Sequence, residues 1–182
     1  MAFNPGQKEL RFEYFLYKLI AWYKQEKPMD IDCLSLTRIK VLKLLFFTSA
    51  IKTDDGNDLL DIFDKFYAMQ HGPVESDIYN SISGKLLLNY NFSSTNIILP
   101  ENIGDDTFVN VEAGIKTRID NALNKLRETN PQIILYNPFQ LVDLSHCWNS
   151  WKRTYEIASL RGKRSEKIEI DFIRTDIPRF AI

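Results

Sequence analysis

Reactive side chains are scarce in this sequence. Its 182 residues include only two cysteines, Cys33 and Cys147, and two histidines, His71 and His146. The first eight residues lack the basic start and the apolar stretch of a signal peptide. Two distant cysteines without an export signal are typical of free thiols rather than of a disulfide. We therefore expect a protein of the reducing cytoplasm in which both thiols are free.

A surplus of one charge and long apolar runs are also missing. The chain has 23 Lys and Arg residues against 24 Asp and Glu residues, a net charge of −1. This balance favours neither a general nucleic-acid coat nor adsorption to a membrane. No apolar run approaches the ~20 residues that span a bilayer. The length and the 45% hydrophobic content predict one globular domain, residues 1–182, with a buried core.

Apolar residues recur at helical spacing over most of the chain. This pattern predicts a mainly α fold with a few short strands. Asn137 suits an N-cap and Pro138 suits a first helical position, so a helix is predicted to begin there and to continue through Trp151. The other predicted helices span Glu9–Gln25, a stretch from a Ser35 cap to about Ile51, and Glu112–Glu128.

The segment Phe66–Tyr79 predicts two helices joined by a forced stop. Apolar residues from Leu59 to Met69 mark one helical face, and Gly72 suits a left-handed C-cap. Pro73 cannot continue the incoming helix, and a second apolar repeat restarts at Val74 and stops near Gly84. This joint would set the angle between two helices and carries no reaction chemistry itself.

Short strands are predicted in two other regions. Ile97–Leu99 and Phe108–Val109 are brief apolar runs inside a long polar loop. Near the end, Ile168, Ile170 and Phe172 alternate with charged residues, a pattern typical of a half-exposed strand.

The two histidines and two thiols do not predict a reactive centre. His71 lies in the last turn of a predicted helix, where its ring can bond free carbonyls. His146 precedes a Trp on an apolar face, and Cys147 is adjacent, so the two side chains diverge on a helix. No nucleophile, base and orienting group are brought together by spacing alone. We expect no catalytic residue, no metal and no cofactor.

Five aspartates follow one another in and after a turn. They resemble a calcium loop only superficially, since its glycine and its closing glutamate are not matched. Helix capping and a solvated face explain them better. The sequence also lacks a Gly-Lys-Ser/Thr phosphate loop and a Gly-rich dinucleotide loop. The aspartates are Asp54, Asp55, Asp58, Asp61 and Asp64.

A basic cluster and several aromatics leave two interpretations open. Arg161, Lys163, Arg164 and Lys167 follow Lys152 and Arg153, and such cations could contact phosphates. Intervening carboxylates favour a solvated surface loop instead. The aromatics either form a protein-binding patch or fill the core. They include Trp22, Tyr23, Trp148, Trp151 and Tyr155.

Three segments, in order, resemble the SocA-like or Panacea antitoxin domain, also seen in proteins labelled phage-associated. Lys43-Leu44-Leu45-Phe46-Phe47 is similar to the opening helix of that family, and Phe66-x-Ala68-x-x-His71-Gly72-Pro73-Val74 with Tyr79 is similar to its Gly-Pro-Val segment. Leu144-Ser145-His146 followed by Trp151 resembles its Leu-Thr-His helix. Met69, Ser145 and Ser150 depart from the family's usual Trp, Thr and Pro. The resemblance does not include residues 1–30. It implies a core domain at 31–182 that is preceded by an N-terminal helical extension.

The resemblance implies a non-enzymatic antitoxin that neutralises a toxin encoded beside it by direct binding. In some relatives the antitoxin also delivers the toxin to a cytoplasmic protease. The signature residues are then mainly structural, and we expect the docking surface elsewhere, at Trp22, Tyr23, Arg161, Lys163 and Arg164. The alternative is a regulator that binds DNA through the 161–167 cluster. Neither hypothesis involves a membrane.

Overall fold

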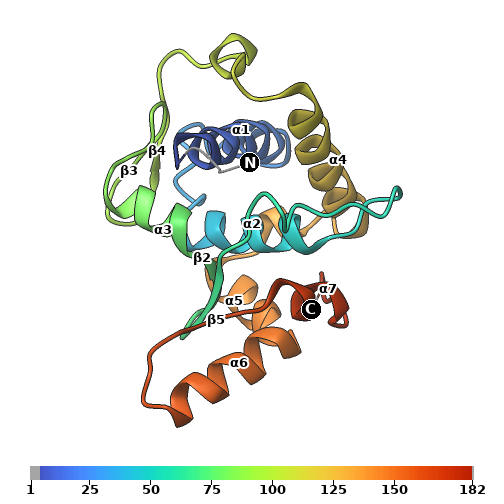
Figure 1. Cartoon of the computed structure of the whole chain (residues 1–182). Helices are drawn as coiled ribbons and strands as arrows, with labels where there is room; N and C mark the ends of the chain where they lie inside the picture. The colour runs from blue at the N-terminus through green and yellow to red at the C-terminus, as the bar shows by residue number, and fades with distance from the viewer. Residues whose placement is uncertain (1–4, 182) are drawn as a thin grey trace.

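The fold is described from a computed structural model, which describes residues 5–181. Helix α2 (Arg38–Ala50) lies at the centre of the molecule, with α1 (Pro5–Glu26) and α4 (Ala113–Thr129) on one side (Figure 1). On the other side of α2 lie α5 (Pro138–His146) and α6 (Asn149–Leu160). The prediction of a mainly helical, single-domain fold is confirmed.

Helix α2 is buried almost all round, because its sequence from Val41 to Ala50 is apolar apart from Lys43, Thr48 and Ser49. The sequence predicted Ser35 as its N-cap, but the N-cap is Thr37, whose hydroxyl accepts a hydrogen bond from the Lys40 N–H. The reason is that the Asp30 carboxylate accepts the Ser35 N–H and holds that residue in the preceding turn. Among the described residues, no helix is long and apolar enough to cross a membrane.

Helix α1 belongs to the same core as α2. Phe12, Phe15, Leu16, Leu19 and Tyr23 have no exposed surface, and they recur at helical spacing. The helix includes all of the predicted Glu9–Gln25 segment. The stretch that the family resemblance leaves outside therefore contributes directly to the apolar interior.

The predicted helix–stop–helix joint is wrong in its first half. Phe66–Met69 is strand β1, and it pairs with β2 (Gly72–Glu75) as an antiparallel hairpin whose turn is Gln70-His71. Gly72 has a φ of +94°, and it begins β2 instead of capping a helix. The helical spacing misled because the residues before β1 form turns, in which the Asp58 carboxylate accepts the Leu60 N–H.

The second half of the joint is a helix, as predicted. Helix α3 (Ser76–Ser83) ends at Gly84. Its N-cap is Glu75, whose carboxylate accepts the Ile78 N–H at 2.8 Å. A carboxylate at this end of the helix is favoured by the partial positive charge of the free N–H groups.

Strand β5 (Glu166–Lys167) joins β1 to give a sheet of order β2-β1-β5. The strand predicted at Ile168, Ile170 and Phe172 is wrong, because β5 ends before Ile168 and Ile170–Thr175 is the short helix α7. Alternation over five residues does not exclude a helix, and the helix directs Ile173 into the core. Strands β3 (Asn91–Phe92) and β4 (Ile97–Ile98) pair with each other. The predicted strand at 108–109 is wrong, because Phe108 ends a 3-10 turn, η1 (Asp105–Phe108).

The cap at Asn137 is confirmed. Its side chain accepts the Gln140 N–H at 3.0 Å, and the Gln140 side chain accepts the Asn137 N–H at 2.9 Å. The predicted helix through Trp151 is nevertheless two helices, α5 and α6, separated at Cys147 and Trp148. Trp148 is 1% exposed, and the break lets its ring enter the core beside Phe46. A second 3-10 turn, η2 (Ile133–Leu135), links α4 to this pair.

Candidate functional site

The three sequence segments that carry the family resemblance meet in space. Lys43 in α2 donates a hydrogen bond from Nζ to the Pro73 carbonyl of the hairpin at 2.8 Å. A Cβ atom on Gly72 would lie 2.2 Å from Ser145 Oγ and 2.9 Å from Lys43 Nζ. Trp151 of α6 donates its indole N–H to the Met69 carbonyl at 2.8 Å. We call this assembly, Lys43, Gly72, Pro73, Ser145 and Trp151, the hairpin junction.

The Lys43 ammonium is enclosed at this junction. The residue is 1% exposed, and no carboxylate among residues 5–181 forms an ion pair with it. Burial lowers the pKa of Lys43 to about 7, because the charged form loses its hydration. A solute has no access to this amine. Its contact with Pro73 ties the hairpin to the central helix.

His146 forms part of an aromatic stack on the same side. Its ring lies 3.8 Å from the Trp151 ring at an interplanar angle of 8°, and Trp151 stacks on Tyr155 at 5.3 Å. Burial, together with the positive charge of Lys43, lowers the pKa of His146. The neighbouring Cys147 thiol donates to the Asp143 carbonyl at 3.4 Å. Cys147 and Cys33 are both free, as predicted.

The other signature residues have separate positions. His71 is exposed in the hairpin turn, so the predicted role in the last turn of a helix is wrong. Phe66, Ala68 and Val74 are buried in the core. Tyr79 is 38% exposed on α3, with the Arg38 guanidinium 4.4 Å from the centre of its ring.

A second cluster fastens α1 to the base of the hairpin. The Lys8 ammonium lies 2.6 Å from Asp64, 2.9 Å from Glu75 and 2.8 Å from Asp77. These three carboxylates lie close enough together to hold a metal ion. The ammonium takes the cation's place between them. Burial opposes the charge on Lys8, but the hydrogen bonds to Asp64 and Asp77 and the charge of Glu75 outweigh it and raise the pKa of Lys8.

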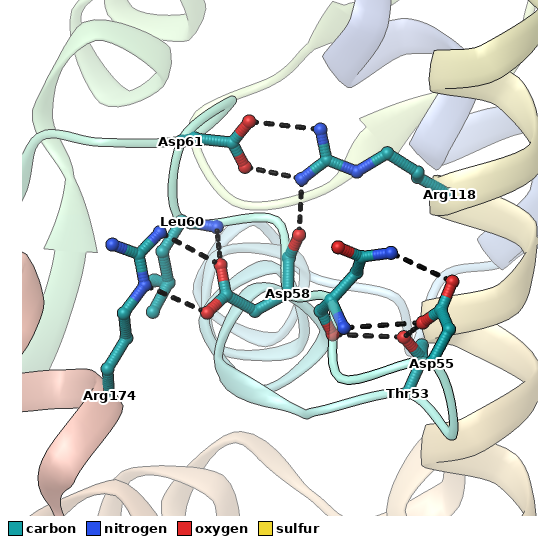
Figure 2. A network of polar contacts seen from close by, with 8 residues as sticks. Thr53, Asp55, Asp58, Leu60, Asp61, Arg118 and Arg174 are labelled. Atoms are coloured by element: carbon teal, nitrogen blue, oxygen red, sulfur yellow. Dashed lines mark hydrogen bonds and ion pairs between the residues drawn. The ribbon is translucent and has the colours of Figure 1, made fainter.

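The remaining aspartates hold α4 and α7 against the 53–61 loop (Figure 2). Arg118 of α4 binds the Asp61 carboxylate through two nitrogens and also the Asp58 carbonyl. Arg174 of α7 binds the Asp58 carboxylate at 2.9 Å and 3.2 Å. Asp55 accepts hydrogen bonds within its own turn. The predicted helix-capping role is wrong, because residues 51–65 form no helix; Asp58 and Asp61 instead form ion pairs to distant helices, which the sequence had not indicated.

The predicted partner-binding residues fall into two groups. Trp22 is 5% exposed and Tyr23 is fully buried, where its hydroxyl donates to Asp30 at 2.6 Å. Placing them on a docking surface is therefore wrong, because α1 turns both side chains inward. Arg161 and Lys163 are exposed on the turn after α6, with 61% and 54% of their side-chain surface accessible, and Arg164 is exposed beside them.

A cleft of about 260 Å³ lies between α1 and α4. Lys18 and Asp120 face each other across it at 3.5 Å, and Arg127 at its other end is paired with Glu26. These charges are compensated within the protein, and the cleft is open to solvent. It has the character of a surface groove rather than of an enclosed ligand site.

Comparisons with protein-family models, with curated proteins and with solved structures returned no match to this chain.

Proposed function

We propose that this protein is an antitoxin that binds and neutralises a toxin encoded by a neighbouring gene. The observation that supports the proposal is the hairpin junction. The segments that resemble the antitoxin family are far apart in the chain, yet there Lys43 donates a hydrogen bond to Pro73 and Trp151 donates one to Met69. Because these segments pack against one another, each one needs the others to keep its position, which explains why they occur together in one sequence.

The junction also gives the resemblance a physical meaning. Its members are buried, so they hold α2, α5, α6 and the hairpin in one geometry and leave partner choice to the surface. A scaffold of this kind suits a family whose members bind unrelated toxins. In this proposal the protein acts in the cytoplasm, by contact alone, and no bond is made or broken.

Co-expression tests the proposal. The adjacent open reading frame is expressed from an inducible promoter, alone and together with this protein, and growth is followed. Growth arrest by the neighbour alone and recovery on co-expression, with co-purification of both proteins, are expected. A harmless neighbour, or arrest that persists when both proteins are present, contradicts it. Repeating the assay without the main cytoplasmic proteases tests whether neutralisation depends on delivery to a protease.

DNA binding is the second candidate, and the exposed cations at 161–167 favour it. A regulator of this type would bind the DNA upstream of its own gene with an affinity that falls steeply with added salt. An electrophoretic shift at low salt that disappears at higher salt would support it. The absence of any shift at low salt would exclude it.

A further inference from the structure

We propose, on the basis of the antitoxin function above, that the exposed face of α6 and the turn after it bind an acidic face of the toxin, with Leu160 as the apolar anchor. In Figure 1 this helix and its turn lie at the lower edge of the molecule, away from α1, α3 and α4. We call the surface formed by the outward residues of 152–167 the α6 face.

The helical part of the α6 face is one continuous stripe of α6. Lys152, Arg153, Glu156, Ile157 and Leu160 are all exposed, and their three- and four-residue spacing places them side by side. The opposite stripe faces the interior. Its buried members are Trp151, Thr154 and Ala158.

The α6 face is strongly positive, whereas the chain as a whole is not. Residues 152–167 include six cations and two glutamates, so their net charge is +4, against −1 for all 182 residues. Glu166 pairs with Arg161 and Lys163. No carboxylate in the described part of the chain forms an ion pair with the other four cations. These are Lys152, Arg153, Arg164 and Lys167.

The ion pairs and the helix dipole of the described residues do not account for Lys152 and Arg153. A cation near the last carbonyls of a helix is stabilised by the helix dipole, which explains Arg161 at the end of α6. Lys152 and Arg153 are the fourth and fifth residues of the helix, too far from its C-terminal end to gain from the dipole. A partner that presents carboxylates to this face would compensate them.

The apolar residues decide between an acidic protein and DNA. Leu160 is 89% exposed and Ile157 is 46% exposed, and the two are neighbours on the helix among the cations. Phosphate contacts use cations and hydrogen-bond donors rather than apolar side chains, so the exposed Leu160 and Ile157 favour a protein partner. A protein interface combines an apolar centre with a polar rim, which is the arrangement found here.

The turn that carries the C-terminal cations has a defined shape. The Gly162 N–H bonds to the Ser159 carbonyl at 3.0 Å and the Lys163 N–H to the Ala158 carbonyl at 2.9 Å, with a Gly162 φ of +68°. This is a Schellman ending, so the helix stops in one fixed geometry. The cations after it are held on a shaped surface, and binding would cost little ordering of the backbone.

The test measures the affinity of the purified neighbouring-gene product for two matched variants. Arg153→Glu/Arg164→Glu reverses two unpaired cations of the α6 face, and Lys24→Glu/Lys52→Glu reverses two exposed cations elsewhere with the same change in net charge. A second pair compares Leu160→Ser with Leu88→Ser. Leu88 is 76% exposed and lies outside the α6 face. Thermal unfolding checks that each variant is folded.

We expect the α6-face variants to bind at least tenfold more weakly, and the controls within about twofold of the wild type. Unchanged affinity of Arg153→Glu/Arg164→Glu and Leu160→Ser, while the wild type still neutralises the toxin, overturns this inference and leaves the proposed function intact. Failure of the wild type to bind the toxin overturns both. If the charge reversal abolishes binding to upstream DNA and spares the toxin, the face is a nucleic-acid surface and the inference is wrong.

Discussion

Lys43 and Pro73 are thirty positions apart in the chain, yet the amine of the first donates a 2.8 Å hydrogen bond to the carbonyl of the second. The bond crosses from the central helix to the hairpin. Since the amine is buried without a counter-charge among residues 5–181, its protonation is coupled to folding. This coupling can be measured.

Protein stability is expected to rise with pH because of Lys43. The pKa of its amine is about 7 in the folded protein against 10.5 when exposed, so between these values the unfolded chain binds more protons. The free energy of unfolding of the wild type should therefore increase from pH 7 to pH 9 relative to that of Lys43→Met, as urea denaturation would measure. Both proteins retain Lys40, whose pKa burial lowers to about 8, so the difference isolates Lys43. Parallel stability curves would contradict the coupling.

Gly72 is expected to be the least replaceable glycine. In Gly72→Ala the new methyl group would lie 2.2 Å from Ser145 Oγ, and the alanine backbone would have to keep a φ of +94°. Gly56→Ala is the matched control, because its φ is +78° and nothing lies within 4 Å of the added carbon. Backbone strain costs roughly 1–2 kcal/mol in both. Overpacking should cost Gly72→Ala about 1–3 kcal/mol more, measured by chemical denaturation. Equal losses would show that the junction is loosely packed.

Removing the Lys8 ammonium should destabilise the protein far more than removing that of Lys65. Lys8→Met leaves the fully buried Glu75 without its cation and close to the carboxylates of Asp64 and Asp77, a loss of about 3–5 kcal/mol. Lys65 is half exposed and, among residues 5–181, its side chain pairs only with Asp77, so Lys65→Met should cost about 1 kcal/mol or less. Adding Glu75→Gln to Lys8→Met should restore part of the loss. No restoration would mean that the cost arises from packing rather than from charge.

His146 is expected to titrate at a lower pH than an exposed histidine. Burial and the positive Lys43 lower its pKa, so below about pH 6.5 the unfolded chain takes up a proton that the folded protein does not. Stability should then fall as the pH drops from 7 to 5, and it should fall less in His146→Gln. The imidazole proton signals in NMR give the pKa directly, with His71→Asn identifying which signal is which. A His146 signal that titrates at or above pH 6.5 would refute the stacked, buried arrangement.

The sequence predicted those elements whose signals are local. Helices α1 and α4 follow from apolar spacing, and the start of α5 follows from Asn137 and Gln140, which lie three residues apart and bond each other. The end of α3 at Gly84 likewise follows from a local signal. Each of these signals involves residues within one or two helical turns, so neighbouring residues in the chain are enough to read them.

The hairpin and α7 could not be predicted in this way. Apolar residues before Gly72 fit a helical repeat, but the backbone there is paired in register from Phe66↔Glu75 to Met69↔Gly72. That pairing gains its stability from burial against α2 and α6. Likewise, Arg174 in α7 is held by Asp58, which lies 116 positions earlier in the chain. No local pattern contains this information.

Sequence alone determined that this chain is a mainly helical protein with few reactive groups, and it located both ends of α4 and the start of α5, because helix propensity and capping act over a few residues. Only the tertiary structure decided that Trp22 and Tyr23 face inward and that the three family-like segments share one junction. It also showed that Leu160 is exposed on the α6 face together with cations that form no ion pair among the described residues. These properties depend on which surfaces of distant segments are buried against one another, and burial is a property of the whole packed chain.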